Sequence, residues 1–171
     1  GYKLSKFVDG TPLSEVENPE TYLEEVSKVL HVLHESGLKA QDDYRPYERL
    51  NAYEKLVTDF GYKHADKYFE LKEEFLSNRE FLDQFPKVIC HNDSQISNMV
   101  VEADQTYLLD WEFTGNNDPI YDVACVGNKE FELALKFLPV YLGREPQAEE
   151  SRRLYLWRAF QCLQWHNVAL Y

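Results

Sequence analysis

The sequence predicts an α+β fold that is predominantly helical, with one small β-hairpin. Apolar residues recur at helical spacing over three stretches before residue 85 and over two more after residue 119. Between these regions the pattern changes to short runs of β-type residues separated by loops. No internal repeat and no linker-like segment interrupts the chain, so we expect one mostly helical domain.

The three early helices have recognisable ends. Asn18 is a good N-cap and Pro19 suits the first helical position, so the first helix is expected to begin there and to end at Gly37. The second ends at Gly61, and the third extends from about Tyr68 to Leu76. Each has one apolar face, which predicts that all three pack on a common core.

The later helices follow a change of pattern at Pro86, which cannot continue a helix. One helix is expected from Ile120 to Leu138, stopped by Pro139, and another from about Glu149 to the last residue. The segment between Pro86 and Ile120 therefore holds the expected strands.

A β-hairpin is predicted between residues 99 and 109. The strand-like runs 99–101 and 106–109 flank a four-residue loop, so paired positions sum to 207. This pairing places Asn98 and Asp110 together at the open end of the hairpin. An amide oxygen and a carboxylate suit Mg²⁺, which takes its other ligands from water and nucleotide phosphates. Asn98 and Asp110 are therefore the candidate magnesium ligands.

The segment from His91 to Asp122 contains seven acidic residues and no Lys or Arg. Such a set fits either a solvated acidic loop or a site that binds a cation. Asp93 precedes Asn98 by five residues, and a carboxylate in this position suits a general base for phosphoryl transfer. His91 lies two residues before Asp93 on the loop that leads into the hairpin, and it is expected to brace this loop through a hydrogen bond rather than to transfer a proton.

The motif resembles that of a known family. Residues 91–98 match the kinase pattern H-x-D-x-x-x-x-N, and Asp110 matches the later metal-binding Asp. Protein kinases continue with Phe-Gly, whereas this chain has Trp111-Glu112. The combination resembles the choline/ethanolamine kinase and aminoglycoside phosphotransferase superfamily, most of all the bacterial choline kinases, and it implies a protein-kinase-like C-terminal lobe.

The resemblance also implies a domain division. Residues 1–13 would be a hinge segment from a missing N-terminal lobe, and residues 14–171 would be the helical C-terminal lobe. A strand is expected from Lys3 to Val8, and the backbone of Phe7 and Val8 would meet the adenine of ATP. No two glycines are close enough to form a phosphate-covering loop, so the fragment alone is not expected to turn over ATP.

For the acceptor, the resemblance implies a quaternary ammonium held partly by Glu112. Such a cation is recognised by aromatic faces and carboxylates. Trp157 and Trp165 lie eight residues apart on the last expected helix, within about 80° of one face. We expect both to line the substrate site, with Tyr121 as a further candidate. Either tryptophan could instead be an ordinary core residue.

The predicted function is Mg²⁺- and ATP-dependent transfer of a phosphoryl group to the hydroxyl of choline, which gives phosphocholine. Other acceptors stay open, namely ethanolamine, an aminoglycoside or a thiamine-like alcohol. A metal-dependent phosphohydrolase built from His91, Asp93, Asp110 and His166 is a different class, and a silent choline-binding module is a third.

The composition bears on the binding partners and the cellular location expected for the protein. Eighteen basic residues against 30 acidic ones give a net charge of −12, which argues against a nucleic-acid partner. Three cysteines without a C-x-x-C pair indicate a reduced, cytoplasmic protein. No apolar run approaches the length of a membrane span.

Overall fold

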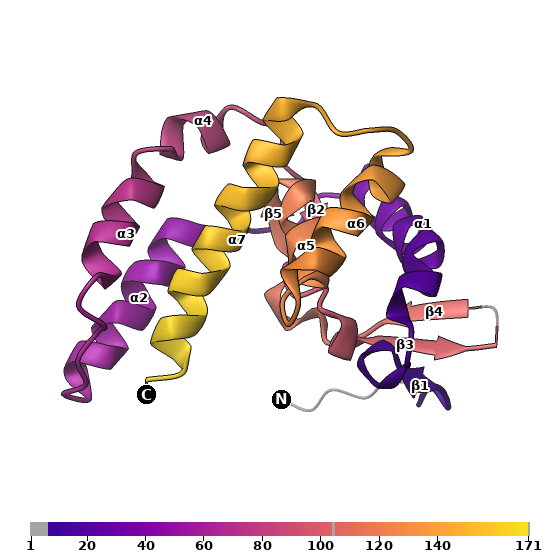
Figure 1. Ribbon diagram of the computed structural model, residues 1–171, viewed down its shortest axis with the longest axis horizontal. Coiled ribbons are helices and arrows are strands. Elements are labelled where there is room, and N and C mark those ends of the chain that lie inside the picture. The colour runs from indigo at the N-terminus through magenta and orange to yellow at the C-terminus, as the bar shows by residue number, and fades with distance from the viewer. Residues whose placement is uncertain (1–6, 104, 171) are drawn as a thin grey trace.

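The computed structural model describes residues 7–103 and 105–170, and within them seven α-helices and five short strands are present (Figure 1). The helices are α1 (Leu23–His34), α2 (Pro46–Asp59), α3 (Tyr68–Leu76), α4 (Arg79–Asp83), α5 (Pro119–Val126), α6 (Phe131–Leu142) and α7 (Ala148–Val168). The strands are β1 (Thr11–Pro12), β2 (Val88–Cys90), β3 (Met99–Glu102), β4 (Gln105–Leu108) and β5 (Gly115–Asn117). This confirms the predicted α+β fold that is mainly helical.

The hairpin has the predicted register. β3 and β4 are antiparallel, with Met99 opposite Leu108, and the backbone N–H of Leu109 donates to the carbonyl of Asn98 at 2.8 Å. Glu102 already pairs with Gln105, so the turn is tighter than the four-residue loop expected. β2 and β5 form a second, two-stranded antiparallel sheet.

The N-terminal strand lies later than predicted. Of the expected strand from Lys3 to Val8, residues 3–6 lie outside the described part, and Phe7 and Val8 are not in a strand. The strand is instead β1, which pairs with β3 and makes it the central strand of three. A Cβ at Gly10 would lie 2.5 Å from the carbonyl oxygen of Val101, so glycine allows this close approach.

Two helix predictions need correction. The first helix begins with a 3-10 turn (Pro19–Tyr22), and α1 ends at His34, before Gly37. The helix expected from 120 to 138 is two helices, α5 and α6. α5 ends at Gly127, where a Cβ would lie 2.6 Å from the Cβ of Ala134, so glycine at this position allows α6 to pack closely against α5.

Pro139 lies inside α6 rather than ending it, and the helix stops at Gly143, which has a left-handed φ of 64°. The lost backbone donor is outweighed by burial of the apolar residues around Pro139, including Phe137, Leu138 and Tyr141.

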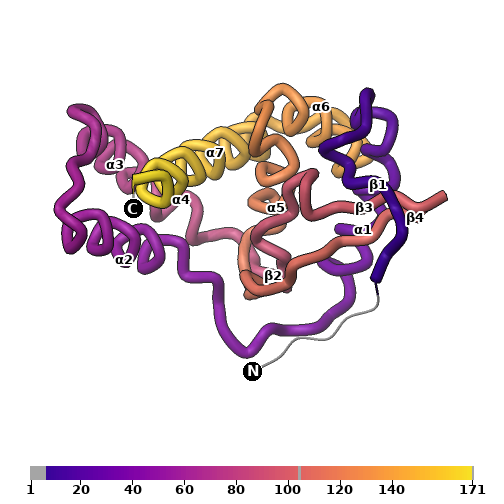
Figure 2. The backbone as a smooth tube through the Cα atoms, turned by 90° about the horizontal axis from the view of Figure 1, so that it is seen from below, coloured from indigo at the N-terminus to yellow at the C-terminus, as the bar shows by residue number. Residues whose placement is uncertain are grey.

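α5 is the centre of the core, because every residue from Ile120 to Val126 is buried and the helix packs against both α6 and α7. Figures 1 and 2 show α2 and α3 beside α7 at one end of the molecule, with α1, α6 and the three-stranded sheet at the other. The two-stranded sheet and α5 lie between these ends. In the described residues no helix is long and apolar enough to cross a membrane.

Candidate active site

Asp93 lies on the loop between β2 and β3 and is only 9% exposed. The side-chain amide of Asn98 donates to the backbone carbonyl of Asp93 at 2.9 Å and to its carboxylate oxygen Oδ2 at 2.7 Å. Gln95 Nε2 donates to the same oxygen at 3.4 Å. Both side-chain bonds therefore hold one carboxylate oxygen and fix the orientation of the group.

Burial raises the pKa of Asp93 to about 6. The hydrogen bonds from Asn98 and Gln95 lower it, and the nearby carboxylates of Asp110 and Asp122 raise it. An acid with this pKa is ionised at neutral pH and is more basic than an exposed aspartate, which suits a general base.

His91 is fully buried behind Asp93. Its Nδ1 accepts from the backbone N–H of Asp93 at 3.2 Å, so the proton sits on Nε2, which donates to the carbonyl of Leu109 at 2.8 Å. Burial lowers the pKa of His91, which favours this neutral form. The imidazole thus ties the loop that carries Asp93 to the end of β4, which is the bracing contact that the sequence predicted.

Asp122 of α5 holds the loop from the other side. Its two carboxylate oxygens accept from the backbone N–H groups of His91 at 2.8 Å and Asn92 at 2.7 Å, and from His34 Nε2 at 3.0 Å. Burial alone would raise the pKa of Asp122, but the bonds and charges of His34 and His91 outweigh it and lower the pKa. Sequence reasoning missed this role, although a carboxylate within an apolar helix was a signal.

Asn98 and Asp110 meet at the end of the hairpin, as the register requires. Asp110 is exposed and has a left-handed φ of 64°, which turns the chain into a 3-10 helix (Trp111–Phe113). Because Nδ2 of Asn98 donates to Asp93, its oxygen Oδ1 is the atom that can face a cation. The donor set of one amide oxygen and one carboxylate fits Mg²⁺.

A cavity of about 100 Å³ opens beside Asp93. Its walls come from the segment that leads into α2, from α2 itself, from the loop before β5, from α5 and from α7. Five aromatic residues line it, together with four amide side chains: Tyr44, Tyr53, Phe113, Tyr121 and Trp165, and Asn92, Asn128, Gln161 and Gln164.

Two of the aromatic residues, Tyr121 and Trp165, were candidates from the sequence. Tyr121 is buried, and its hydroxyl lies 3.0 Å from that of Tyr44, while Trp165 is 39% exposed at the cavity. Tyr44, Tyr53 and Phe113 were missed because they come from separate segments that only the tertiary fold brings together.

The other predicted substrate residues, Glu112 and Trp157, do not line this cavity, and the predicted hinge residues Phe7 and Val8 precede β1. Trp157 is 3% exposed and donates its indole N–H to Asp118 at 2.8 Å. Trp157 and Trp165 differ by about 80° around the helix, and their rings line different cavities. Glu112 is exposed on the turn after Asp110 and does not line the cavity beside Asp93. Phe7 is 83% exposed, and Val8 is half-buried before β1.

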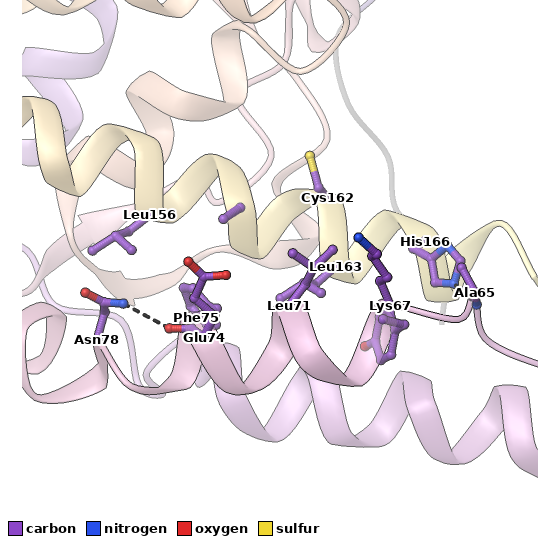
Figure 3. A pocket seen from close by; sticks show the side chains of 12 residues that line it. Ala65, Lys67, Leu71, Glu74, Phe75, Asn78, Leu156, Cys162, Leu163 and His166 are labelled. Atoms are coloured by element: carbon purple, nitrogen blue, oxygen red, sulfur yellow. Dashed lines mark hydrogen bonds between the residues drawn. The ribbon is translucent and has the colours of Figure 1, made fainter.

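A larger apolar groove of about 490 Å³ lies between α3 and α7, away from Asp93 (Figure 3). His166 lines this groove, and its Nε2 accepts from the backbone N–H of Ala65 at 3.3 Å. His166 is therefore an interhelical residue and does not join His91, Asp93 and Asp110 in one site.

A loop aspartate, an asparagine five residues later and an aspartate at the end of a hairpin are the arrangement of kinase-like phosphotransferases. The sequence model of the phosphotransferase enzyme family, APH, matches residues 1–163 of this chain. The chain belongs to this family, as the sequence motif indicated.

Individual relatives are more distant. Protein LicA of Haemophilus influenzae is 26% identical over 130 residues, which cover 74% of this chain and 49% of that protein. A LicA homolog of Metamycoplasma hominis is 30% identical over 122 residues, with 70% and 47% covered. The chain thus spans about half the length of these relatives.

Solved structures share the fold. A choline/ethanolamine kinase family protein from Mesorhizobium loti has a TM-score of 0.80 at 20% identity, with 94% of this chain and 56% of that chain covered. Choline kinase LicA from Streptococcus pneumoniae has a TM-score of 0.73 at 20% identity, with 90% and 56% covered. At these identities the likeness establishes the kinase-like fold.

Proposed function

We propose that this chain forms the catalytic and acceptor-binding part of a kinase that transfers the γ-phosphoryl group of ATP to the hydroxyl of choline. One observation carries the proposal: the carboxylate of Asp93 lies on the wall of a cavity lined by five aromatic rings. A trimethylammonium group donates no strong hydrogen bond and is held by aromatic faces. Two of the similar structures are described as choline or choline/ethanolamine kinases.

In the proposed reaction the choline hydroxyl donates a hydrogen bond to Asp93. As its oxygen attacks the γ-phosphorus, the proton passes to the carboxylate, the bond to the β–γ bridging oxygen breaks, and ADP leaves. His91 and Asp122 keep the loop rigid, so the carboxylate is oriented before the acceptor arrives.

Asn98 Oδ1 and the Asp110 carboxylate would hold Mg²⁺, which when bound neutralises charge on the phosphates. The nucleotide would reach the hinge backbone at Phe7 and Val8. We assign residues 1–13 to this hinge and residues 14–171 to the C-terminal lobe. The phosphate-covering lobe would be supplied by sequence outside this chain, in keeping with the half of each relative that the chain spans.

The cavity also bears on the alternative acceptors. Its five aromatic rings suit a quaternary ammonium better than the many hydroxyl and amino groups of an aminoglycoside. For the phosphohydrolase alternative, His166 faces a different groove from Asp93, so the proposed metal-binding set is not assembled.

The test is ADP formation by the complete gene product with ATP, Mg²⁺ and choline, ethanolamine or kanamycin. We expect choline to give the highest kcat/KM and the isolated 171-residue chain to be inactive. ADP formed equally without any acceptor would favour the phosphohydrolase, and turnover with another acceptor alone would exclude choline as the substrate.

A further inference from the structure

The side chain of Gln95 is held at both ends. Its Nε2 donates to Asp93 Oδ2 at 3.4 Å, and its Oε1 accepts from the side-chain amide of Asn128 at 3.5 Å. Both distances are long for N–H···O bonds. Because Gln95 bridges the two partners, its position relative to Asp93 depends on where Asn128 is fixed.

Asn128 is fixed by Arg158 of α7. Its guanidinium Nη1 donates to the backbone carbonyl of Asn128 at 3.1 Å and to the side-chain oxygen of Asn128 at 3.2 Å. These bonds engage the oxygen of the amide and leave its nitrogen directed to Gln95. Arg158 is half-buried, so its contacts are only partly screened by solvent.

α7 connects this chain of contacts to the acceptor. Trp165 lies seven residues after Arg158, two turns along the same face of the helix. Gln95, Asn128, Arg158 and Trp165 together line one cavity of about 260 Å³ that adjoins the catalytic loop. The helix that presents the aromatic ring to the acceptor thus also fixes the amides that orient Asp93.

We propose that Arg158 is a positioning residue for phosphoryl transfer. It acts on Asp93 through Asn128 and Gln95, and the hydrogen bonds that join these four residues form a relay. The inference rests on the proposed function, in which Asp93 takes the acceptor proton. The two amides that reach Asp93 hold Oδ2, which directs Oδ1 to the acceptor hydroxyl. Catalytic hydrogen bonds are commonly long in the absence of substrate and tighten when it binds.

Four variants of the complete gene product test the relay: Arg158→Gln, Gln95→Ala, the double variant, and Arg158→Lys. We expect kcat to fall about tenfold in each of the first two, with KM for ATP and choline within about twofold, because orientation is lost and binding is not. The double variant should be no worse than the worse single variant, since both break one chain of contacts. Arg158→Lys should restore most of kcat.

Arg152→Gln is the matched control, because Arg152 also lies on α7 but donates to Asn78, away from Asp93. It should keep the wild-type kcat. Urea unfolding of every variant separates loss of positioning from loss of fold. Additive losses in the double variant, or a rise in KM at unchanged kcat, would overturn the relay.

The contact itself has a readout that needs no turnover. In a two-dimensional ¹H–¹⁵N spectrum, the side-chain amide signal of Gln95, assigned through Gln95→Ala, should shift in Arg158→Gln and stay in place in Arg152→Gln. An unshifted signal contradicts the relay even if the enzyme is active. If the signal shifts but the protein shows no choline-dependent turnover, the contacts of the relay are supported and the proposed acceptor is refuted.

Discussion

The proposed catalytic segment, residues 91–98, and the proposed acceptor wall, the five aromatic rings that line the cavity beside Asp93, are built in different ways. In the catalytic segment, buried polar side chains bind the backbone: the Asn92 amide donates to the carbonyls of Cys90, Phe113 and Gly115. In the acceptor wall, aromatic rings pack on one another, as Tyr44 does on Tyr121.

We infer from this difference that the catalytic segment determines the reaction and that the acceptor wall determines which acceptor is used. A buried polar group that loses its hydrogen-bond partner lowers the free energy of unfolding by a few kcal/mol, so the catalytic segment tolerates little change. Packed aromatic rings tolerate exchange for side chains of similar volume, so we expect substitutions in the acceptor wall to change the preferred acceptor and to leave the reaction unchanged. Substitutions in the two regions should therefore have different signatures.

The largest effect is expected at the base. Asp93→Asn keeps the size of the side chain but cannot accept the proton, so kcat should fall about 10²–10⁴-fold with little change in KM for choline. Coupled ADP assays on the complete gene product measure this. Asp66→Asn, on an exposed loop, is the control and should match the wild type. An active Asp93→Asn enzyme would remove Asp93 from the mechanism.

The next effect is on stability. Asp122→Asn places an amide N–H against one of the backbone donors of His91 and Asn92, and we expect a loss of about 3 kcal/mol in the free energy of unfolding. Urea denaturation measures the loss. Asp59→Asn removes an exposed pair with Lys55 and should change stability by less than about 0.5 kcal/mol. Equal losses in both would contradict the importance of the buried network.

The same network gives a pH dependence. The pKa of Asp122 is lower in the folded protein than its ordinary value, so its contribution to stability is complete above that value and is lost as the pH falls through the folded pKa. Unfolding free energies measured downward from about pH 5 should therefore decline more steeply in the wild type than in Asp122→Asn. Parallel curves would show that Asp122 does not carry the dependence.

The smallest effect is expected in the acceptor wall. Trp165→Ala should raise KM for choline about five- to thirtyfold and KM for ethanolamine less, because a quaternary ammonium depends more on aromatic faces. Tyr155→Ala, an exposed ring on the same helix, is the control. Trp157→Phe should lower the urea midpoint without a selective effect on choline, since its indole binds Asp118. A selective effect of Trp157→Phe would reverse this assignment.

The sequence predicted the part of the site that is local. The hairpin register followed from strand pattern and loop length, so the meeting of Asn98 with Asp110 could be foreseen. The clamp by Asp122 could not, because its partners His91 and His34 lie 31 and 88 residues away. Tyr44 and Tyr53 could not be predicted for the same reason. Helical spacing alone also could not show that Trp157 packs against Asp118 rather than lining the cavity beside Asp93.

The errors in the fold have two different causes. The end of α5 at Gly127 had a local signal, because glycine commonly follows the last residue of a helix, and the prediction missed it. Pro139 stays helical because its neighbours are buried, and local preferences do not show that burial.

The pairing of β1 with β3 has a mechanical consequence. Thr11 and Pro12 are joined to Val101 and Val100, and β3 begins one residue after Asn98. The backbone pairing therefore ties the segment that precedes Leu13 to β3, whose first residue directly follows Asn98. The proposed magnesium site is thus coupled through the sheet to the proposed hinge segment, and this coupling does not pass through α2 or α7.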